Sequence, residues 1–296
     1  MNELMTSLSP DDVTIPAFLA GLCVMVLFIA GLTVDCIILS GLKKHREAWA
    51  DKCAHLRKRP WIWTDAVHLL LVLGTVFAAM VLAAQIMEQC GIILSVHTER
   101  LLLLGETLLM QGVAITTVEY LRRRHRQSPA ACFASAPLSW KSDIKQGLVF
   151  YLAVIPPVVL SAFLAKVVLQ YFDLPIESQG ILVGFADPTA PFWFRGGLVG
   201  LAIILAPLVE EIAFRGIALP LVAKHASPAT AVIVVSILFA LVHAHLPAMV
   251  PLFVVAVGFA LAYIHSGSIL VPITMHAIFN SVNLLVFYLS YDMTQL

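Results

Sequence analysis

Two adjacent glutamates, Glu210 and Glu211, lie in an apolar stretch, residues 196–222, that is long enough to cross a membrane as a helix. A charged side chain at bilayer depth costs from about 2.5 to more than 10 kcal/mol, so it is kept only where it is paired, hydrated or used. Arg215 follows Glu211 by four residues, the spacing of an ion pair on a helix. Glu210 points about 100° away and has no such partner. The spacing therefore predicts a neutralised Glu211 and a Glu210 whose carboxylate is free to act.

Two histidines and an asparagine lie in later apolar stretches. Glu210 and His243 are each fourteen residues from the turn at 224–229, which is about 21 Å along a helix. His276 and Asn280 are four residues apart, and hence on one helix face, about 10 and 16 Å into the last stretch. A carboxylate can deprotonate water, an imidazole can hold that water or relay its proton, and N–H donors can stabilise an oxyanion. This combination of side chains suits hydrolysis.

The composition is that of a membrane protein. Of the 296 residues, 60% are apolar and 12% are charged, whereas soluble domains have about 45–50% and 25%. The five cysteines show neither a CxxC pair nor a Cys/His metal spacing, which argues against a disulfide framework. No Lys or Arg precedes the first apolar stretch and no cleavage site is evident, so we do not expect a signal peptide.

Apolar stretches of about 20 residues predict an all-α fold, a polytopic transmembrane helix bundle with about eight spans. The stretches fall near residues 16–42, 61–87, 101–121, 147–170, 196–223, 229–245, 249–265 and 269–290. A plausible linker at 122–146 divides the chain into two parts. We expect a three-span N-terminal region, residues 1–130, of unknown role, and a five-span part, residues 131–296, that holds almost all of the polar residues described above.

Basic residues predict the orientation of the spans. Residues 43–60 contain seven Lys or Arg and residues 122–146 contain six, and Lys224 lies on the same side; the opposite loops have only Arg100 and Arg195. The positive-inside rule places the basic loops in the cytoplasm. We therefore expect an integral, multi-pass protein of a prokaryotic plasma (inner) membrane. These loops could also contact anionic lipid or nucleic acid, but topology explains them better, and no nucleic-acid partner is expected.

Three strings in the second half of the chain resemble the motifs of a known family. VEEIAFRG, LFALVHAHL and VPITMHAIFNS match, in order and each on an expected span, the EExxxR, FxxxH and HxxxN motifs of the CPBP intramembrane endopeptidases. This glutamate-type group includes CAAX proteases and bacteriocin-processing proteins. The resemblance covers roughly residues 147–290. It implies hydrolysis of a peptide bond in a peptide or lipid-modified protein within the lipid bilayer, with a C-terminal CaaX-like tail as one candidate substrate.

The resemblance also implies a role for each catalytic position. Glu210 matches the general base that activates the attacking water, and His276 matches the histidine that helps to position and activate that water. His243 and Asn280 match the pair proposed to form the oxyanion hole. Phe239, one turn before His243, is expected to serve packing.

Other interpretations of the same residues stay open. Glu211 and Arg215 match supporting positions that orient the site and balance its charge, but they could form a purely structural ion pair. No cofactor or metal is expected; alternatively, two histidines and a glutamate could bind Zn²⁺ and make the chain a zinc-dependent membrane protease, although HExxH is lacking. Intramembrane carboxylates and histidines also suit a proton-coupled transporter. The same fold could serve a non-catalytic membrane scaffold or immunity factor.

Overall fold

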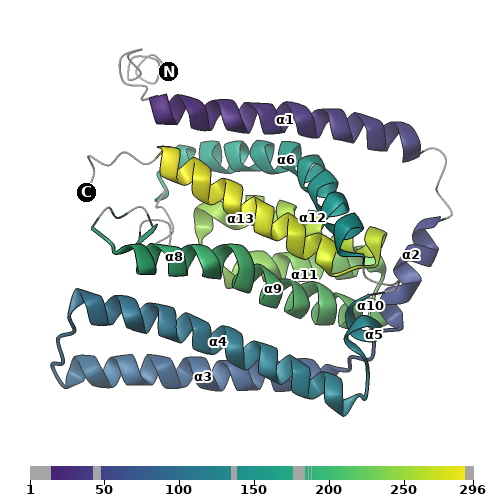
Figure 1. The fold of residues 1–296 in the computed structure, drawn as a ribbon. Coiled ribbons are helices and arrows are strands. Elements are labelled where there is room, and N and C mark those ends of the chain that lie inside the picture. Colours follow the sequence, from purple (N-terminus) through teal and green to yellow (C-terminus); the bar gives the residue numbers. More distant parts are fainter. Residues whose placement is uncertain are drawn as a thin grey trace.

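The structure is a computed structural model that describes residues 15–42, 48–134, 139–175, 184–185, 187 and 189–290. All regular elements within these ranges are helices (Figure 1). In chain order they are α1 (Ile15–Leu42), α2 (Ala48–Arg57), α3 (Trp63–Gln89), α4 (Val96–Arg124), α5 (Pro129–Phe133), α6 (Trp140–Tyr171), α8 (Phe192–Gly200), the π-helical η2 (Leu201–Leu205), α9 (Ala206–Glu211), the π-helical η3 (Ile212–Ala218), α10 (Leu219–His225), α11 (Pro228–Val242), the 3-10 helix η4 (Leu246–Ala248), α12 (Met249–Ser266) and α13 (Leu270–Ser290).

Seven helical segments in the described part of the chain are long and apolar enough to cross a membrane. They are Ile15–Ile38, Trp63–Gln89, Val96–Arg124, Trp140–Tyr171, Phe192–His225, Leu246–Ser266 and Leu270–Ser290. A shorter apolar helix, Pro228–Val242, corresponds to the remaining predicted span. The protein is therefore an integral, multi-pass membrane protein, and the predicted all-α bundle of about eight spans is confirmed.

Helix α11 is shorter than the sequence suggests. Its 15 residues extend for about 22 Å, less than the roughly 30 Å of a bilayer's hydrocarbon core. The helix ends because Ala244 adopts a left-handed backbone conformation (φ 46°), and η4 with Pro247 follows. His243 is consequently the C-cap residue of α11 rather than a residue inside the helix.

Local signals explain where several helices begin and end. The side chains of Ser95, Ser128 and Ser227 each accept a hydrogen bond from the backbone N–H three residues later, which caps α4, α5 and α11. A proline follows two of these serines directly and occupies the first helical turn, where its missing N–H has no cost. Gly267, with φ 68°, ends α12 in the left-handed conformation that favours glycine.

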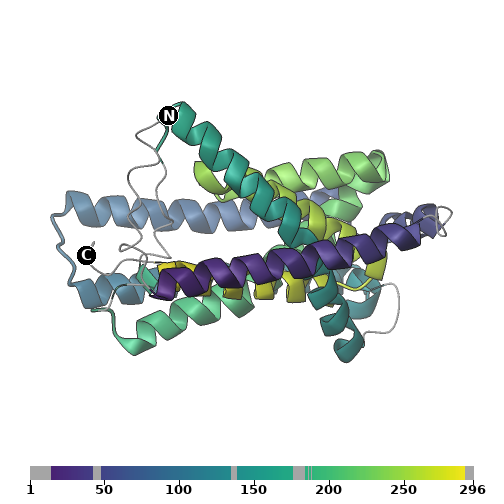
Figure 2. The ribbon, with the colours of Figure 1, turned by 90° about the horizontal axis from the view of Figure 1, so that it is seen from above.

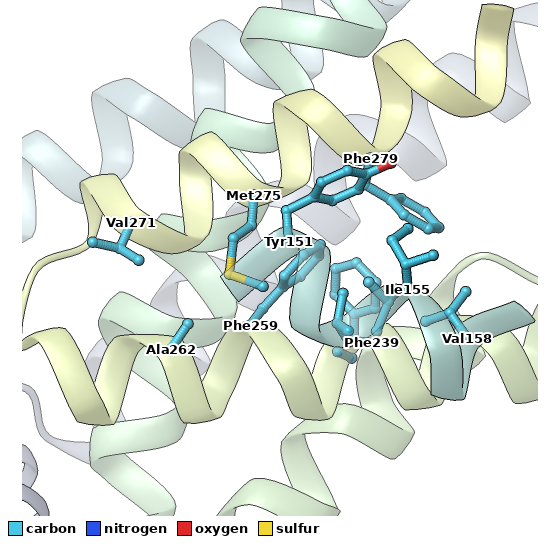
Figure 3. Packing of buried hydrophobic residues seen from close by; sticks show 12 residues of the cluster. Tyr151, Ile155, Val158, Phe239, Phe259, Ala262, Val271, Met275 and Phe279 are labelled. Carbon is cyan, nitrogen blue, oxygen red and sulfur yellow. The ribbon is translucent and has the colours of Figure 1, made fainter. Parts of the chain in front are cut away.

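The apolar core lies where α6, α11, α12 and α13 meet. Figure 3 shows Tyr151 and Ile155 from α6, Phe239 from α11, Phe259 from α12 and Met275 from α13 packed together. These side chains are almost completely buried, and large aromatic residues contribute the most apolar area to such a cluster. The core therefore fixes the relative positions of α11, α12 and α13, two of which carry the predicted motifs.

Helix α1 packs against the C-terminal helices. It contacts α6 and α13, and Figure 2 shows it running along α13 and crossing α6 at an angle. The approach is closest at Gly31, where an added Cβ would lie 2.4 Å from the carbonyl oxygen of Leu152 and 2.6 Å from Pro156. Helix α6 is bent (Figure 1). It contains Pro156 and Pro157, which cannot donate backbone hydrogen bonds, and proline inside a helix is a usual cause of such a bend.

Helices α3 and α4 form a hairpin on the other side of the molecule (Figure 1). The hairpin packs against α8, η2 and α9 through α4; an added Cβ at Gly197 would lie 2.8 Å from the side chain of Leu104. The three N-terminal spans thus flank the motif-bearing helices from two sides. The division of the chain into residues 1–130 and 131–296 stays a prediction.

Several polar side chains gather at the end of the bundle where α2, α5 and α10 meet, a group that we call the basic junction. Lys224 donates hydrogen bonds to the carbonyls of Arg59 and Trp61, at 2.7 and 2.6 Å. Asp65 is fully buried and bonds the His125 ring at 2.7 Å. The junction comprises Arg57, Arg59, Asp65, His125 and Lys224. It brings residues from three separate basic regions of the sequence to one end of the bundle.

Candidate active site

The first motif lies on an irregular helix. Residues Phe192–His225 form one apolar segment in which α8, α9 and α10 are separated by the π-helical turns η2 and η3. Glu210 and Glu211 end α9, and Arg215 lies in η3. Pro207 and Pro220 occupy the first turns of α9 and α10 and cannot donate backbone hydrogen bonds. Single π-helical turns inside α-helices are rare and are frequent at functional sites.

An inner network of three charged or polar side chains links two motif helices. One oxygen of Glu211 (Oε1) accepts hydrogen bonds from Arg215 Nη1 and from His276 Nδ1, each at 2.9 Å. Arg215 also donates through Nη2 to the carbonyl of Ala256, at 3.0 Å. Glu211 and Arg215 have no solvent exposure, and His276 is 4% exposed. The Glu211–Arg215 ion pair that the spacing predicts is present, and it also holds the histidine of the third motif.

Two phenylalanines enclose this network. The guanidinium carbon of Arg215 lies 4.6 Å from the ring centre of Phe239 and 5.1 Å from that of Phe259, which is within cation–π range. Phe259 also stacks on His276 at 4.9 Å, and Phe239 packs on His243 at 4.8 Å. Phe239 therefore does more than the predicted packing. The sequence does not indicate the contacts of Phe259 or of the Ala256 carbonyl, because α12 carries no polar residue of the three motifs.

The structure brings Glu210 together with both histidines. Its Oε2 atom lies 3.9 Å from Nε2 of His243 and 3.9 Å from Nε2 of His276. This oxygen is buried and makes no hydrogen bond within the described part of the chain. The side chains of Glu210 and His243 are 27% and 25% exposed, whereas His276 lies behind them at 5%. We call Glu210, His243 and His276 the carboxylate–imidazole cluster.

Hydrogen bonds on the far side of each ring set the tautomers in the cluster. His243 Nδ1 lies 2.8 Å from the carbonyl oxygen of Phe239, which can only accept, so Nδ1 carries the hydrogen. His276 Nδ1 likewise donates to Glu211, whose carboxylate provides the counter-charge for buried Arg215. In the neutral form of each ring, the Nε2 lone pair therefore faces Glu210.

Asn280 lies one turn after His276 on α13. Its Nδ2 donates a hydrogen bond of 2.7 Å to the carbonyl of Ala202, in η2. No described hydrogen bond joins Asn280 to Glu210 or to either histidine. One amide hydrogen remains on Nδ2 after the bond to Ala202. The third motif thus contacts the first-motif helix at two levels, through Glu211 and through Ala202.

The arrangement is suited to proton transfer and to holding water. Among the residues that the structure describes, no group of three or more His, Cys, Asp or Glu side chains is arranged to hold a metal ion. Glu210 and the two imidazoles come closest in composition, but ligands of a tetrahedral zinc ion lie about 3.4 Å apart, closer than the 3.9 Å separations here. The cluster would have to contract to bind zinc.

The fold and the site define a polytopic membrane protein with a buried ion pair and a carboxylate–imidazole cluster. A family model described as type II CAAX prenyl endopeptidase Rce1-like matches residues 192–282, from the start of α8 into α13. This segment contains all three motifs, so the predicted resemblance to the CPBP/CAAX-protease family is confirmed. That family consists of proteases, which supports a peptide-bond hydrolase acting on a membrane-associated protein. No curated protein and no solved structure matches the chain.

Proposed function

We propose that the protein is an intramembrane endopeptidase in which Glu210 activates water to hydrolyse a peptide bond of a membrane-associated substrate. The observation that carries this proposal is the position of Glu210 Oε2, a buried oxygen that faces two imidazole nitrogens and makes no hydrogen bond to a described residue. Among the described carboxylate oxygens that are buried without a hydrogen bond, Oε2 of Glu210 is the one that lies within 4 Å of two imidazole nitrogens. The family match to residues 192–282 supplies the class of reaction.

The spacing within the cluster suits one bridging water. A water oxygen about 2.8 Å from each of two acceptors can span the 3.9 Å between Glu210 Oε2 and His276 Nε2. Such a water donates one hydrogen to the carboxylate and the other to the imidazole, which leaves an oxygen lone pair for the scissile carbonyl carbon. Glu210 removes a proton as the new C–O bond forms. His276 is held in place for this role by Glu211.

The tautomers constrain how the oxyanion is stabilised. Neutral His243 has no hydrogen on Nε2, so it becomes an oxyanion donor only after that nitrogen gains a proton. Glu210, 3.9 Å away, can pass it the proton taken from water. The second amide hydrogen of Asn280 provides a further donor. When the C–N bond breaks, the proton moves to the leaving amine, so that water is added across the peptide bond and no other reactant is consumed.

We propose that the substrate is a peptide or a lipid-modified protein, with a C-terminal CaaX-like tail as the candidate to test first. Purified protein in lipid nanodiscs should be given a library of prenylated and unprenylated peptides, with cleavage followed by mass spectrometry. Glu210→Gln should reduce cleavage at least about 100-fold with an unchanged unfolding temperature, because the amide cannot accept the proton. The matched control is Glu99→Gln, at an exposed position on α4. Full activity of Glu210→Gln would remove Glu210 from the mechanism.

A zinc-dependent mechanism is the second candidate, because one carboxylate oxygen lies 3.9 Å from the Nε2 atoms of two histidines. We propose that no metal or other cofactor is needed. Chelator-treated protein should retain its cleavage activity without stoichiometric zinc in elemental analysis. Loss of activity that only added zinc restores would establish the metalloenzyme instead.

A further inference from the structure

An apolar cavity of about 160 Å³ lies between the α3–α4 hairpin and the helix that carries the first motif. Its wall is formed by α3, α4, α5, α9 and η3, and its lining is almost entirely apolar. Apolar cavities of about 150 Å³ can hold a molecule the size of benzene, so this one has room for a segment of one acyl chain. The residues that carry the argument are Leu69, Ala114, Val118, Val209, Ile212 and Ala213.

The cavity lies at the end of the bundle that carries the basic residues. Ala114 is ten residues, or about 15 Å of helix, from the end of α4 at Arg124. Glu119 forms ion pairs with Arg122 at 2.7 Å and with Arg123 at 2.6 Å at the edge of the cavity. Across residues 119–126, positive charges exceed negative charges by three. Arg123 is 74% exposed, and Arg124 is also exposed, so both can reach an anionic group at the membrane surface.

We propose that this cavity binds one acyl chain of an anionic phospholipid whose phosphate lies against Arg123 and Arg124. An apolar cavity between membrane helices that opens beside a cluster of arginines matches both parts of such a lipid. The outer wall includes Ile115, which is 40% exposed, and Pro129, which is also exposed, so a chain can enter from the bilayer. A soluble anion would match the arginines but not the apolar lining.

The bound chain would touch the back of the motif helix. Val209, Ile212 and Ala213 line the cavity and directly flank Glu210 and Glu211 in the sequence. Phe133 of α5 also lines the cavity and packs on Gly216, where an added Cβ would lie 2.8 Å from its ring. An occupied cavity therefore supports α9 and η3 from the side opposite α11 and α13. An effect on peptide cleavage rests on the proposed function, but binding of the lipid does not.

Lipid retention tests the proposal without any assay of catalysis. Full-length protein should be delipidated, exposed to equal amounts of phosphatidylglycerol and phosphatidylcholine, and examined by native mass spectrometry. We expect one tightly retained phosphatidylglycerol per chain. Ala114→Phe fills the cavity and should weaken retention at least tenfold, whereas Ala83→Phe, at an exposed position on α3, should not. Joint replacement of Arg123 and Arg124 by Gln should remove the preference for phosphatidylglycerol, and joint replacement of exposed Lys141 and Lys145 by Gln should preserve it.

A photoreactive phosphatidylglycerol with a diazirine in its acyl chain tests the site in the unaltered protein, so a folding defect of Ala114→Phe cannot obscure the result. Labelled peptides should contain residues 114–118 or 209–213. Labelling confined to other helices would overturn the proposal, as would equal retention of the two lipids. Displacement of phosphatidylglycerol by a prenylated peptide but not by excess unlabelled phosphatidylglycerol would assign the cavity to substrate and would also overturn it. If Glu210→Gln loses peptide cleavage but still retains the lipid, that result would support the lipid site independently of the proposed function.

Discussion

The basic junction and the carboxylate–imidazole cluster both contain charged or titratable side chains packed among the helices, but these side chains make different contacts. In the junction, Lys224 donates to two backbone carbonyls, Arg59 donates to the carbonyls of Ala131 and Ala134, and Arg57 donates to that of Ala223. In the cluster, Oε2 of Glu210 faces two imidazoles across 3.9 Å and makes no hydrogen bond to a described residue.

This difference separates polar residues that hold the fold from those that can react. A side chain bonded to backbone carbonyls has a fixed geometry and gains stability from every bond. Asp65 in the junction also has a buried oxygen, Oδ1, without a hydrogen bond to a described residue, but its Oδ2 is bonded to His125 and to the backbone N–H of Ile62. Oε2 of Glu210 instead faces two imidazole nitrogens, which is the position of a group that can transfer a proton. The inner network of Glu211, Arg215 and His276 lies between the two cases, because it is hydrogen-bonded and also positions a member of the cluster.

The largest stability effect is expected at the inner network. Arg215→Met should lower the free energy of unfolding by about 3–5 kcal/mol, because it leaves the Glu211 carboxylate buried without its partner. Unfolding in mixed detergent micelles measures this change. The double variant, in which Glu211 and Arg215 are both replaced by Met, should recover part of the loss. If the double variant is less stable than Arg215→Met, the ion pair is not what makes the single substitution costly.

A smaller effect that leaves catalysis intact is expected at the basic junction. Lys224→Met removes two hydrogen bonds from a charged donor, so it should cost about 1.5–3 kcal/mol. Cleavage per folded molecule should stay within about twofold of the unaltered protein, because Lys224 does not touch the cluster. A loss of activity at full folding would contradict the distinction between the two regions. Lys166→Met provides a control at a lysine outside the junction.

The two phenylalanines that enclose the inner network, Phe239 and Phe259, should each contribute less to stability than Lys224 does. Phe259→Leu removes one ring from Arg215 and the stack on His276, so it should cost about 1–2 kcal/mol of stability. Activity should also fall, because the imidazole loses a contact that fixes its plane. Phe77→Leu, at an exposed position on α3, should change neither quantity. A loss of stability in Phe259→Leu without a loss of activity would mean that Phe259 acts only as apolar volume.

The smallest effect is expected outside the membrane spans, at Asp187. Hydrogen bonds from Thr189 and the charge of Arg100 lower the pKa of this carboxyl below its ordinary value of 3.8. A lowered pKa adds stability that is fully present above the ordinary value and is lost as the pH falls through the folded-state pKa. Asp187→Asn should therefore cost less than about 1 kcal/mol at neutral pH and nothing in strong acid. Thermal unfolding of both proteins as a function of pH measures this difference. A greater loss of stability for Asp187→Asn in acid than at neutral pH would contradict the prediction.

The sequence predicts the helices and the polar residues better than it predicts their contacts. Apolar stretches locate the spans because bilayer thickness sets helix length, and the i, i+4 spacing identifies the Glu211–Arg215 pair. The distances of Glu210 and His243 from the turn at 224–229 place the two at one depth, and the structure joins them. The catalytic roles of these residues and of Asn280 stay predictions.

Contacts through the backbone and through apolar residues have no comparable signal in the sequence. The carbonyls of Ala202 and Ala256 bind Asn280 and Arg215, but any residue could supply them. Phe259 is one of sixteen phenylalanines, so its type does not distinguish it. The π-helical turns and the early end of α11 are not predicted by the residue pattern, because tertiary context can override the local preferences that a single sequence shows.

The most direct test of the account is cleavage of a membrane-associated peptide in water enriched with ¹⁸O, comparing the unaltered protein with Glu210→Gln. We predict that one ¹⁸O atom enters the new carboxyl group in a single turnover of the unaltered protein. The Glu210→Gln protein, folded to the same unfolding temperature, should incorporate the label at least about 100-fold more slowly. Incorporation at the same rate in both proteins would contradict the central claim, because Glu210 would then not be the base that activates water.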